Sequence, residues 1–250
     1  MKTFTKSLVA LSMIAITTTS NAQTDTTKIK GMGKNLVKVS LTSLALNTYS
    51  FSYERKIGRK IAVGIGYRVM PKGSLPFKSN LESVIDDPET FKHIDGLTTG
   101  NTAITPEIKF YFGRGVFRGF YIAPFARFAK YTAELGSFEF DVNGAKSTIP
   151  LSGELKTTTG GLLFGAQWKL SKLVYLDWSI LGPQYGSSKG FLEGSKTLSA
   201  QEQQALREEL EGLEIPFADT EVTVSNSGVR ADITGPWAGV RASIGLGFRF

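Results

Sequence analysis

Apolar and polar residues alternate along most of the chain beyond residue 34, with the period of two that is typical of β-strands. In the closing stretch every second residue from Val240 to Phe250 is apolar, and Arg241 and Arg249 are among the residues between them. We find eight such segments, at residues 35–45, 47–56, 61–70, 103–112, 119–134, 155–170, 174–186 and 236–250. The pattern therefore predicts an all-β protein.

The predicted strands are joined by connections of two kinds. Short turns are expected at 57–60, 113–119 and 171–173, and long loops at about 71–102, 135–154 and 187–235. The first connection, near Leu46 and Asn47, is tight and departs from the alternation. Eight up-and-down strands with short turns at one end predict an antiparallel transmembrane barrel of the outer-membrane type, with short turns and both termini periplasmic. Pro124 lies inside the fifth strand, so we expect a bulge or local break there.

The N-terminus has the pattern of a secretory signal peptide. Lys2 and Lys6 precede an apolar run from Leu8 to Ile16, and Ser20-Asn21-Ala22 fits a cleavage site. The run is too short for a transmembrane helix. The expected organisation is a signal peptide at 1–22, a periplasmic arm at 23–34 and the barrel at 35–250.

Charged residues inside the predicted strands lie on the face opposite the aromatic residues. A secreted sandwich would turn this polar face to solvent, whereas a small membrane barrel encloses it and pairs the charges. Aromatic residues near the strand ends favour the barrel, because they form girdles at membrane interfaces. We therefore predict a polar cluster in the lumen, made up of Glu54, Arg68, Glu107, Lys109, Arg127, Asp177 and Arg241.

The distribution of charge argues against nucleic-acid binding, although the formal net charge is +7. Of the 22 acidic residues, 18 lie in the three predicted long loops when these are extended to the strand edges, and the basic excess is divided among the N-terminal arm, the short turns and the strands. No single basic face results, as a nucleic-acid site would need. We expect contacts with outer-membrane lipids and no nucleic-acid partner. The chain has no cysteine, which excludes disulfides and thiolate metal sites.

Three stretches of the chain resemble a known group of proteins. The hairpin "LTSLALNTYSFSYER", the strand exit "YRVMPKG" and the closing "GVRASIGLGFRF" are similar to small outer-membrane barrels abundant in Bacteroidota, related in architecture to OmpX and OmpA. The resemblance covers the chain after the signal peptide at the level of fold, and the family is largely uncharacterised. It implies that Phe248 and Phe250 form the C-terminal signal read by the barrel-assembly machinery.

Enzymatic chemistry has one weak candidate. His93, the only histidine, lies beside Asp95 in the first predicted long loop. A general base needs its proton source within hydrogen-bond reach, but a single loop histidine is usually solvated. We predict no cofactor. Asp86, Asp87 and Glu89 are weak candidates for a metal site, because they lack the ligand spacing of a calcium loop.

The long loops also carry structural signals. Ser199 and Glu202 form a capping-box pattern, and Leu206, Leu210 and Leu213 recur at helical spacing. A short helix over 198–213 is therefore expected in the last loop. Its apolar face either packs on other loops or on the barrel rim, or serves as a docking face for a protein partner. Asn143-Gly144 predicts a hairpin turn, so that the strands continue beyond the membrane.

These observations favour a non-enzymatic outer-membrane barrel that acts in envelope structure, or in surface binding and adhesion, with a surface protein or glycan as candidate partner of the loops. The alternatives are a lipid-modifying enzyme or protease that uses His93, and a narrow pore or small-ligand transporter. Eight strands leave room in the lumen only for side chains, which argues against the pore.

Overall fold

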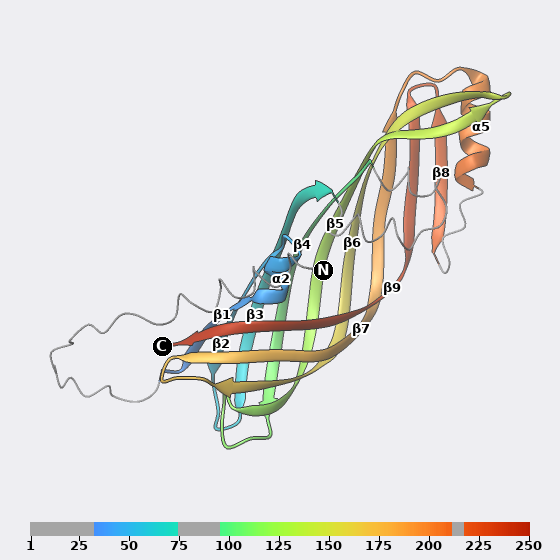
Figure 1. The fold of residues 1–250 in the computed structure, drawn as a ribbon. Helices are drawn as coiled ribbons and strands as arrows, with labels where there is room; N and C mark the ends of the chain where they lie inside the picture. The colour runs from blue at the N-terminus through green and yellow to red at the C-terminus, as the bar shows by residue number, and fades with distance from the viewer. Residues whose placement is uncertain (1–32, 75–95, 212–217) are drawn as a thin grey trace, which may run out of the picture. The chain divides into compact units, whose positions relative to one another are not determined.

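Eight antiparallel strands close into a β-barrel in the computed structural model of the protein, which describes residues 33–74, 96–211 and 218–250 (Figure 1). The ring consists of β1 (Asn35–Ser40), β2 (Tyr49–Lys56), β3 (Ile61–Ser74), β4 (Leu97–Tyr111), β5 (Gly119–Val142), β6 (Ala145–Lys169), β7 (Val174–Ser195) and β9 (Gly228–Arg249). Each strand pairs with the next along the chain, except that β7 pairs with β9. The predicted eight-stranded up-and-down barrel is confirmed.

The ring closes between the first and the last strand. Leu36 pairs with Arg249 and Ser40 with Gly245, and the backbones of Asn35 and Phe250 exchange two hydrogen bonds of 3.0 Å. Closure pairs both edges of the sheet that an open arrangement would expose.

Side chains of β9 alternate strictly between the two faces of the barrel wall. Arg241, Gly245 and Arg249 face the lumen, whereas Val240, Ile244 and Phe248 are exposed on the outside. The other strands carry the same division, and the outer face therefore shows large apolar side chains while the lumen is polar. This arrangement is the reverse of that in a water-soluble barrel.

The strands are longer than predicted at the loop end, where alternation weakens but pairing continues. β5 and β6 form one long hairpin through Asn143 and Gly144, whose φ angles of 54° and 84° suit a primed two-residue turn. The hairpin predicted at this turn is thus present. A ninth strand, β8 (Asp219–Ser225), which the sequence pattern did not reveal, pairs with β9 beside the ring.

The first predicted strand is too long. β1 ends at Ser40, whose hydroxyl accepts a hydrogen bond from the Ser43 backbone N–H and so caps α2 (Leu41–Ala45). The irregular alternation of residues 41–45 reflects this helical turn, which ends before Asn47 at a positive φ of 51°. As a result, α2 lies beside β9, and the hydroxyl of Thr42 accepts a hydrogen bond from the backbone of Ile244.

A local break without a bulge occurs at Pro124. Glu107 pairs with Phe125 and Phe110 with Ile122 in one register, but the two residues of each strand between these pairs do not pair across β4 and β5. On its other side Pro124 pairs with Leu162 of β6. The structure places register shifts elsewhere, near Met70, Leu135, Phe164 and Ser179.

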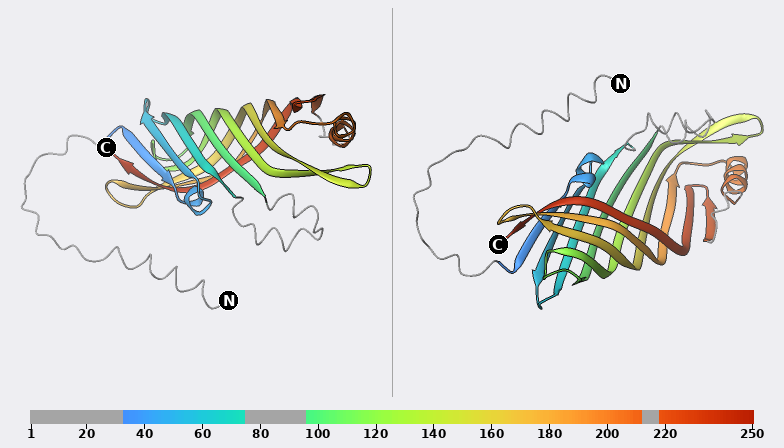
Figure 2. Two further views of the ribbon diagram at one scale, coloured as in Figure 1. Left: turned by 90° about the horizontal axis from the view of Figure 1, so that it is seen from above. Right: turned by 60° about the horizontal axis from the view of Figure 1, so that its bottom comes forward.

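Beyond the barrel, the connections fold into what we call the loop-end extension, comprising residues 135–151, 192–211 and 218–233 (Figure 2). It contains the predicted helix, α5 (Ala200–Glu211), whose Leu206 and Leu210 are buried. They pack in a small apolar core that consists of Phe140, Ile149, Leu151, Leu198, Leu206, Leu210, Val224 and Val229. The helix therefore packs on neighbouring segments, whereas Leu213 lies outside the described residues. Within the described chain, neither helix is long and apolar enough to cross a membrane.

Candidate functional site in the barrel lumen

Four charged side chains from four strands meet inside the lumen near the short turns. Lys109 of β4 lies 2.6 Å from Glu54 of β2 and 3.3 Å from Asp177 of β7. Lys38 of β1 forms ion pairs with the same two carboxylates. All four side chains are almost completely buried. Two cations and two anions therefore form a balanced network, which tethers opposite sides of the barrel wall.

Neutral side chains satisfy the remaining oxygens of this network. The Tyr121 hydroxyl donates to Asp177 Oδ1 at 2.9 Å, and the Tyr111 hydroxyl lies 3.1 Å from Glu54 Oε2. The Gln167 amide donates to Asp177 at 3.0 Å and to Glu54 at 3.2 Å. Buried ion pairs are stable only when their other polar atoms are also bonded, and this network fulfils that condition.

The connection between β4 and β5 closes the lumen below the network. Val116 and Phe117 are buried, and the Phe117 ring contacts the rings of Tyr111 and Tyr175 edge-on at 6.3 and 6.2 Å. The Arg249 guanidinium lies 5.1 Å from the Phe117 ring. Two residues of the predicted turn at 113–119 thus plug the lumen. The signal that could have shown this is the apolar pair Val116-Phe117 in a turn that is otherwise rich in glycine and arginine.

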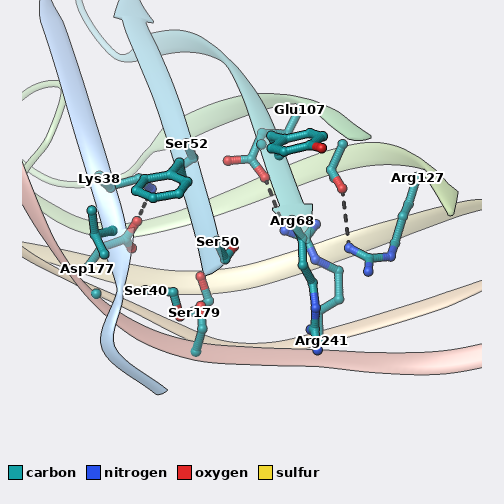
Figure 3. Close-up of a pocket in the computed structure, with 17 residues that line it drawn as sticks. Lys38, Ser40, Ser50, Ser52, Arg68, Glu107, Arg127, Asp177, Ser179 and Arg241 are labelled. Carbon is teal, nitrogen blue, oxygen red and sulfur yellow. Dashed lines mark hydrogen bonds and ion pairs between the residues drawn. The ribbon is translucent and has the colours of Figure 1, made fainter. Parts of the chain in front are cut away.

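The three predicted lumen arginines gather on the loop-end side of the network, apart from the lysines (Figure 3). Arg68, Arg127 and Arg241 come from β3, β5 and β9, and they line a cavity of about 270 Å³. Glu107 lies between the two groups, 3.5 Å from Lys109 and 3.8 Å from Arg241. The seven predicted residues therefore divide into a paired network and an arginine-rich cavity.

A second cavity, of about 620 Å³, lies nearer the loop-end extension and is mainly apolar. Tyr131 lines both cavities and contacts Trp237 of β9 at 5.2 Å between ring centroids. Because β5 and β9 are not neighbours in the sheet, this contact crosses the lumen and marks the boundary between the two cavities.

Sequence reasoning missed several members of the network. Lys38 is absent from the predicted lumen cluster, but it projects from β1 into the lumen; its position on the polar face of the first strand is the signal that could have shown it. Gln167 and Tyr121 are uncharged and were not singled out, although both lie on the polar face of their strands.

Other predicted residues do not join this site. His93 and the acidic residues Asp86, Asp87 and Glu89 lie outside the described residues. Among the residues that the structure describes, no three His, Cys, Asp or Glu side chains are grouped to hold a metal ion. The side chains of Phe248 and Phe250 are exposed on the outer surface of the barrel.

The sequence matches no protein-family model and no curated protein. Among solved structures, CarO from Acinetobacter baumannii is 13% identical with a TM-score of 0.37, covering 87% of this chain and 98% of that chain. The outer-membrane protease OmpT from Escherichia coli is 9% identical with a TM-score of 0.39, covering 88% and 93%. The N-terminal β-barrel domain of Pseudomonas aeruginosa OprF is 7% identical with a TM-score of 0.28, covering 88% and 100%. At these values we transfer no residue role or activity from them.

Proposed function

We propose that the protein is a non-conducting barrel of the bacterial outer membrane that presents the loop-end extension as a surface for binding. The single observation that carries this proposal is the exposed apolar wall around a polar lumen. In water, such a surface would be unstable, because its area far exceeds the patches that soluble monomers expose.

Aromatic side chains lie toward both ends of this apolar wall. Phe112, Phe120 and Trp168 are exposed near the short turns. Tyr49 and Tyr67 are exposed toward the loop end, where β2 pairs with β3. Aromatic residues at two levels support girdles at the two interfaces of a membrane. The signal-peptide pattern of residues 1–22 and the resemblance to Bacteroidota barrels support export to an outer membrane, with assembly directed by Phe248 and Phe250.

The lumen favours a closed barrel over a pore. An ion path would have to pass the network of Lys38, Glu54, Lys109 and Asp177 and then the buried ring of Phe117. To open such a path, the ion pairs would have to separate. Separation is costly, because each side chain would then be a buried charge without a partner. The pore alternative therefore has little support from the described residues.

The loop-end extension supports a role in binding at the cell surface. Its own apolar core orders the β5–β6 hairpin, α5 and β8. β8 pairs with β9 and is the last strand of the sheet on that side, with α5 packed against it, so the extension presents an ordered surface of strands and helix to a partner. A surface protein or a glycan is the partner class that we propose.

Electrophoresis and membrane extraction test the membrane assignment. A folded barrel should migrate differently in unboiled and boiled SDS samples and should stay in membranes washed at alkaline pH. Identical migration together with release by the wash would contradict the proposal. In planar bilayers, the purified protein should show no stable conductance steps, and steady ion-selective channels would instead favour the pore.

A further inference from the structure

We propose that the cavity lined by Arg68, Arg127 and Arg241 binds a phosphate-class oxyanion. The described residues that line it include these three cations and no acidic residue; the others are Ser43, Ser50, Met70, Asn101, Tyr131, Ser179, Gln184, Val240, Ala242 and Ser243. Three like charges enclosed together raise the free energy of the cavity unless an anion joins them.

The arginines have few internal partners, and most of these are uncharged. Arg241 lies over the Phe125 ring at 4.4 Å, and Arg127 is hydrogen-bonded to the Tyr131 side chain. The Arg241 Nη2 atom lies 3.8 Å from Glu107 Oε2, and Glu107 is shared with Lys109. Arg127 Nη1 donates a long hydrogen bond of 3.4 Å to the Thr105 hydroxyl. One shared carboxylate thus faces three guanidinium groups, in contrast to the balanced lysine network beside it.

Unused donors remain on all three arginines. The Nε atoms of Arg68 and Arg127 and the Nη1 atom of Arg241 are buried and have no hydrogen-bond partner among the described residues. Buried donors without partners are rare in folded proteins, because each one loses its bond to water. Figure 3 shows the adjoining smaller pocket, which the same three arginines line together with Lys38, Glu107 and Asp177; there the side chains of Arg68 and Arg241 run side by side, with Arg127 nearby. Guanidinium groups arranged in this way suit the several oxygens of a phosphate group.

Neutral donors complete the cavity. Hydroxyls of Ser50, Ser179 and Ser243 and the amide of Gln184 line the same space. The Asn101 amide also lies there, but it already donates to the Lys130 carbonyl at 3.1 Å. Hydroxyl and amide donors could bind the oxygens that the arginines leave free, without adding negative charge. The chemistry of the lining therefore favours an oxyanion over a cation or a neutral sugar.

The cavity is also lined by residues of the outer surface. β1 ends at Ser40, opposite Gly245, so residues 240–244 of β9 have no β1 partner and adjoin α2 instead. Val240 and Ala242, which face outward, line the cavity together with the inward-facing Arg241. The oxyanion can therefore belong to a free phosphate that enters from the loop end or to a phospholipid headgroup that enters beside α2.

Calorimetric titration of the folded protein in dodecyl maltoside, a detergent without phosphate, tests the proposal. One arm uses inorganic phosphate and the other dihexanoyl phosphatidic acid, with dihexanoyl phosphatidylcholine as the zwitterionic comparison. We expect one binding event in at least one of the first two arms. Binding of inorganic phosphate with similar affinity identifies the free anion as the source, whereas binding of phosphatidic acid alone identifies the lipid headgroup.

The variants Arg68→Gln and Arg241→Gln should weaken this binding about tenfold or more, since each removes a charged hydrogen-bond donor. Arg68→Lys should restore part of the affinity. Arg118→Gln, in an exposed short turn, is the matched control and should bind like the native protein. Absence of binding in both arms, or an equal loss in Arg118→Gln, would overturn the proposal. The mobility of unboiled samples shows separately that each variant is folded as a barrel.

Discussion

At the scale of single residues, Lys109 shows how charge is kept inside this barrel. Its ammonium group contacts Glu54, Asp177 and Glu107 and also lies 4.1 Å from the centroid of the Tyr121 ring. The side chain is almost completely buried, so these contacts replace water entirely. The pairing is consequently structural, and its loss would leave carboxylates buried with too few cations.

Lys109→Met should therefore lower the free energy of unfolding by about 3–5 kcal/mol, the usual cost of breaking a buried ion pair. Urea titration of the folded protein in detergent, followed by tryptophan fluorescence, measures the change. Lys72→Met is the control: Lys72 pairs with Glu134 on the surface, and the change there should stay within about 1 kcal/mol. Equal effects of the two substitutions would contradict a buried network.

At the scale of elements, α5 begins with a capping box that also attaches the helix to the β5–β6 hairpin. The Ser199 backbone N–H donates to Glu202 at 2.9 Å, and the Glu202 backbone N–H donates to the Ser199 hydroxyl at 3.3 Å. Ser147 of β6 and Lys196 also donate to Glu202. A sequence motif for a helix start thus serves as a link between two segments.

Hydrogen bonds lower the pKa of the Glu202 carboxyl to about 2 from its usual value near 4.5. The bond from the Ser199 backbone has the largest effect, and those from Lys196 and Ser147 have smaller effects. Because the pKa is lower in the folded state, the carboxylate's contribution is fully present above pH 4.5 and is lost as the pH falls toward 2. Hydrogen-exchange protection of the α5 amides should decrease over this range. Glu202→Gln should lack this step, and Glu208→Gln, on the exposed face of α5, should retain it. A step that persists in Glu202→Gln would exclude this carboxylate as its cause.

Leu206→Ala should loosen the loop-end extension without opening the barrel. Leu206 is fully buried in the core of the extension, and such truncations cost about 2–5 kcal/mol. We expect faster proteolysis within residues 192–211, while the heat-dependent mobility of the barrel is preserved. Arg207→Ala, at an exposed neighbouring position, should leave proteolysis unchanged. Loss of the mobility shift in Leu206→Ala would show that the extension and the barrel form one cooperative unit.

At the scale of the whole molecule, the last residue completes the ring. Phe250 exchanges backbone hydrogen bonds with Asn35, while its side chain is exposed on the outer surface. The backbone bonds do not depend on the side chain, so a substitution of Phe250 should leave ring closure intact and test only the proposed assembly signal.

Phe250→Ala should therefore reduce the amount of barrel assembled in the outer membrane of cells several-fold, but should leave refolding of the purified chain in detergent unchanged. Gel mobility of unboiled membranes and of refolded protein measures the two quantities. Phe120→Ala, which removes another exposed phenylalanine near the short turns, is the control for loss of lipid contact. Equal assembly of both variants would argue against a terminal signal.

The sequence by itself determined the eight barrel strands, the face that each presents and the capped helix in the last loop. These features are local: alternation in β9 or the Ser199–Glu202 motif can be recognised without knowing any partner strand. The tertiary structure decided where strands end and which lumen residues meet. The pairing of β8 and the burial of Phe117 depend on neighbours that are distant in sequence.

The division of the polar lumen into two parts was likewise decided only by the closed ring. Alternation places Lys38, Lys109 and Arg68 on one face, but the relative register of the strands sets their height in the barrel. That register brings the lysines to Glu54 and Asp177 and leaves the arginines with one shared carboxylate. Ion pairs depend on the distance between the charged atoms. For side chains on opposite walls of the lumen, this distance is set only when the sheet closes into a ring.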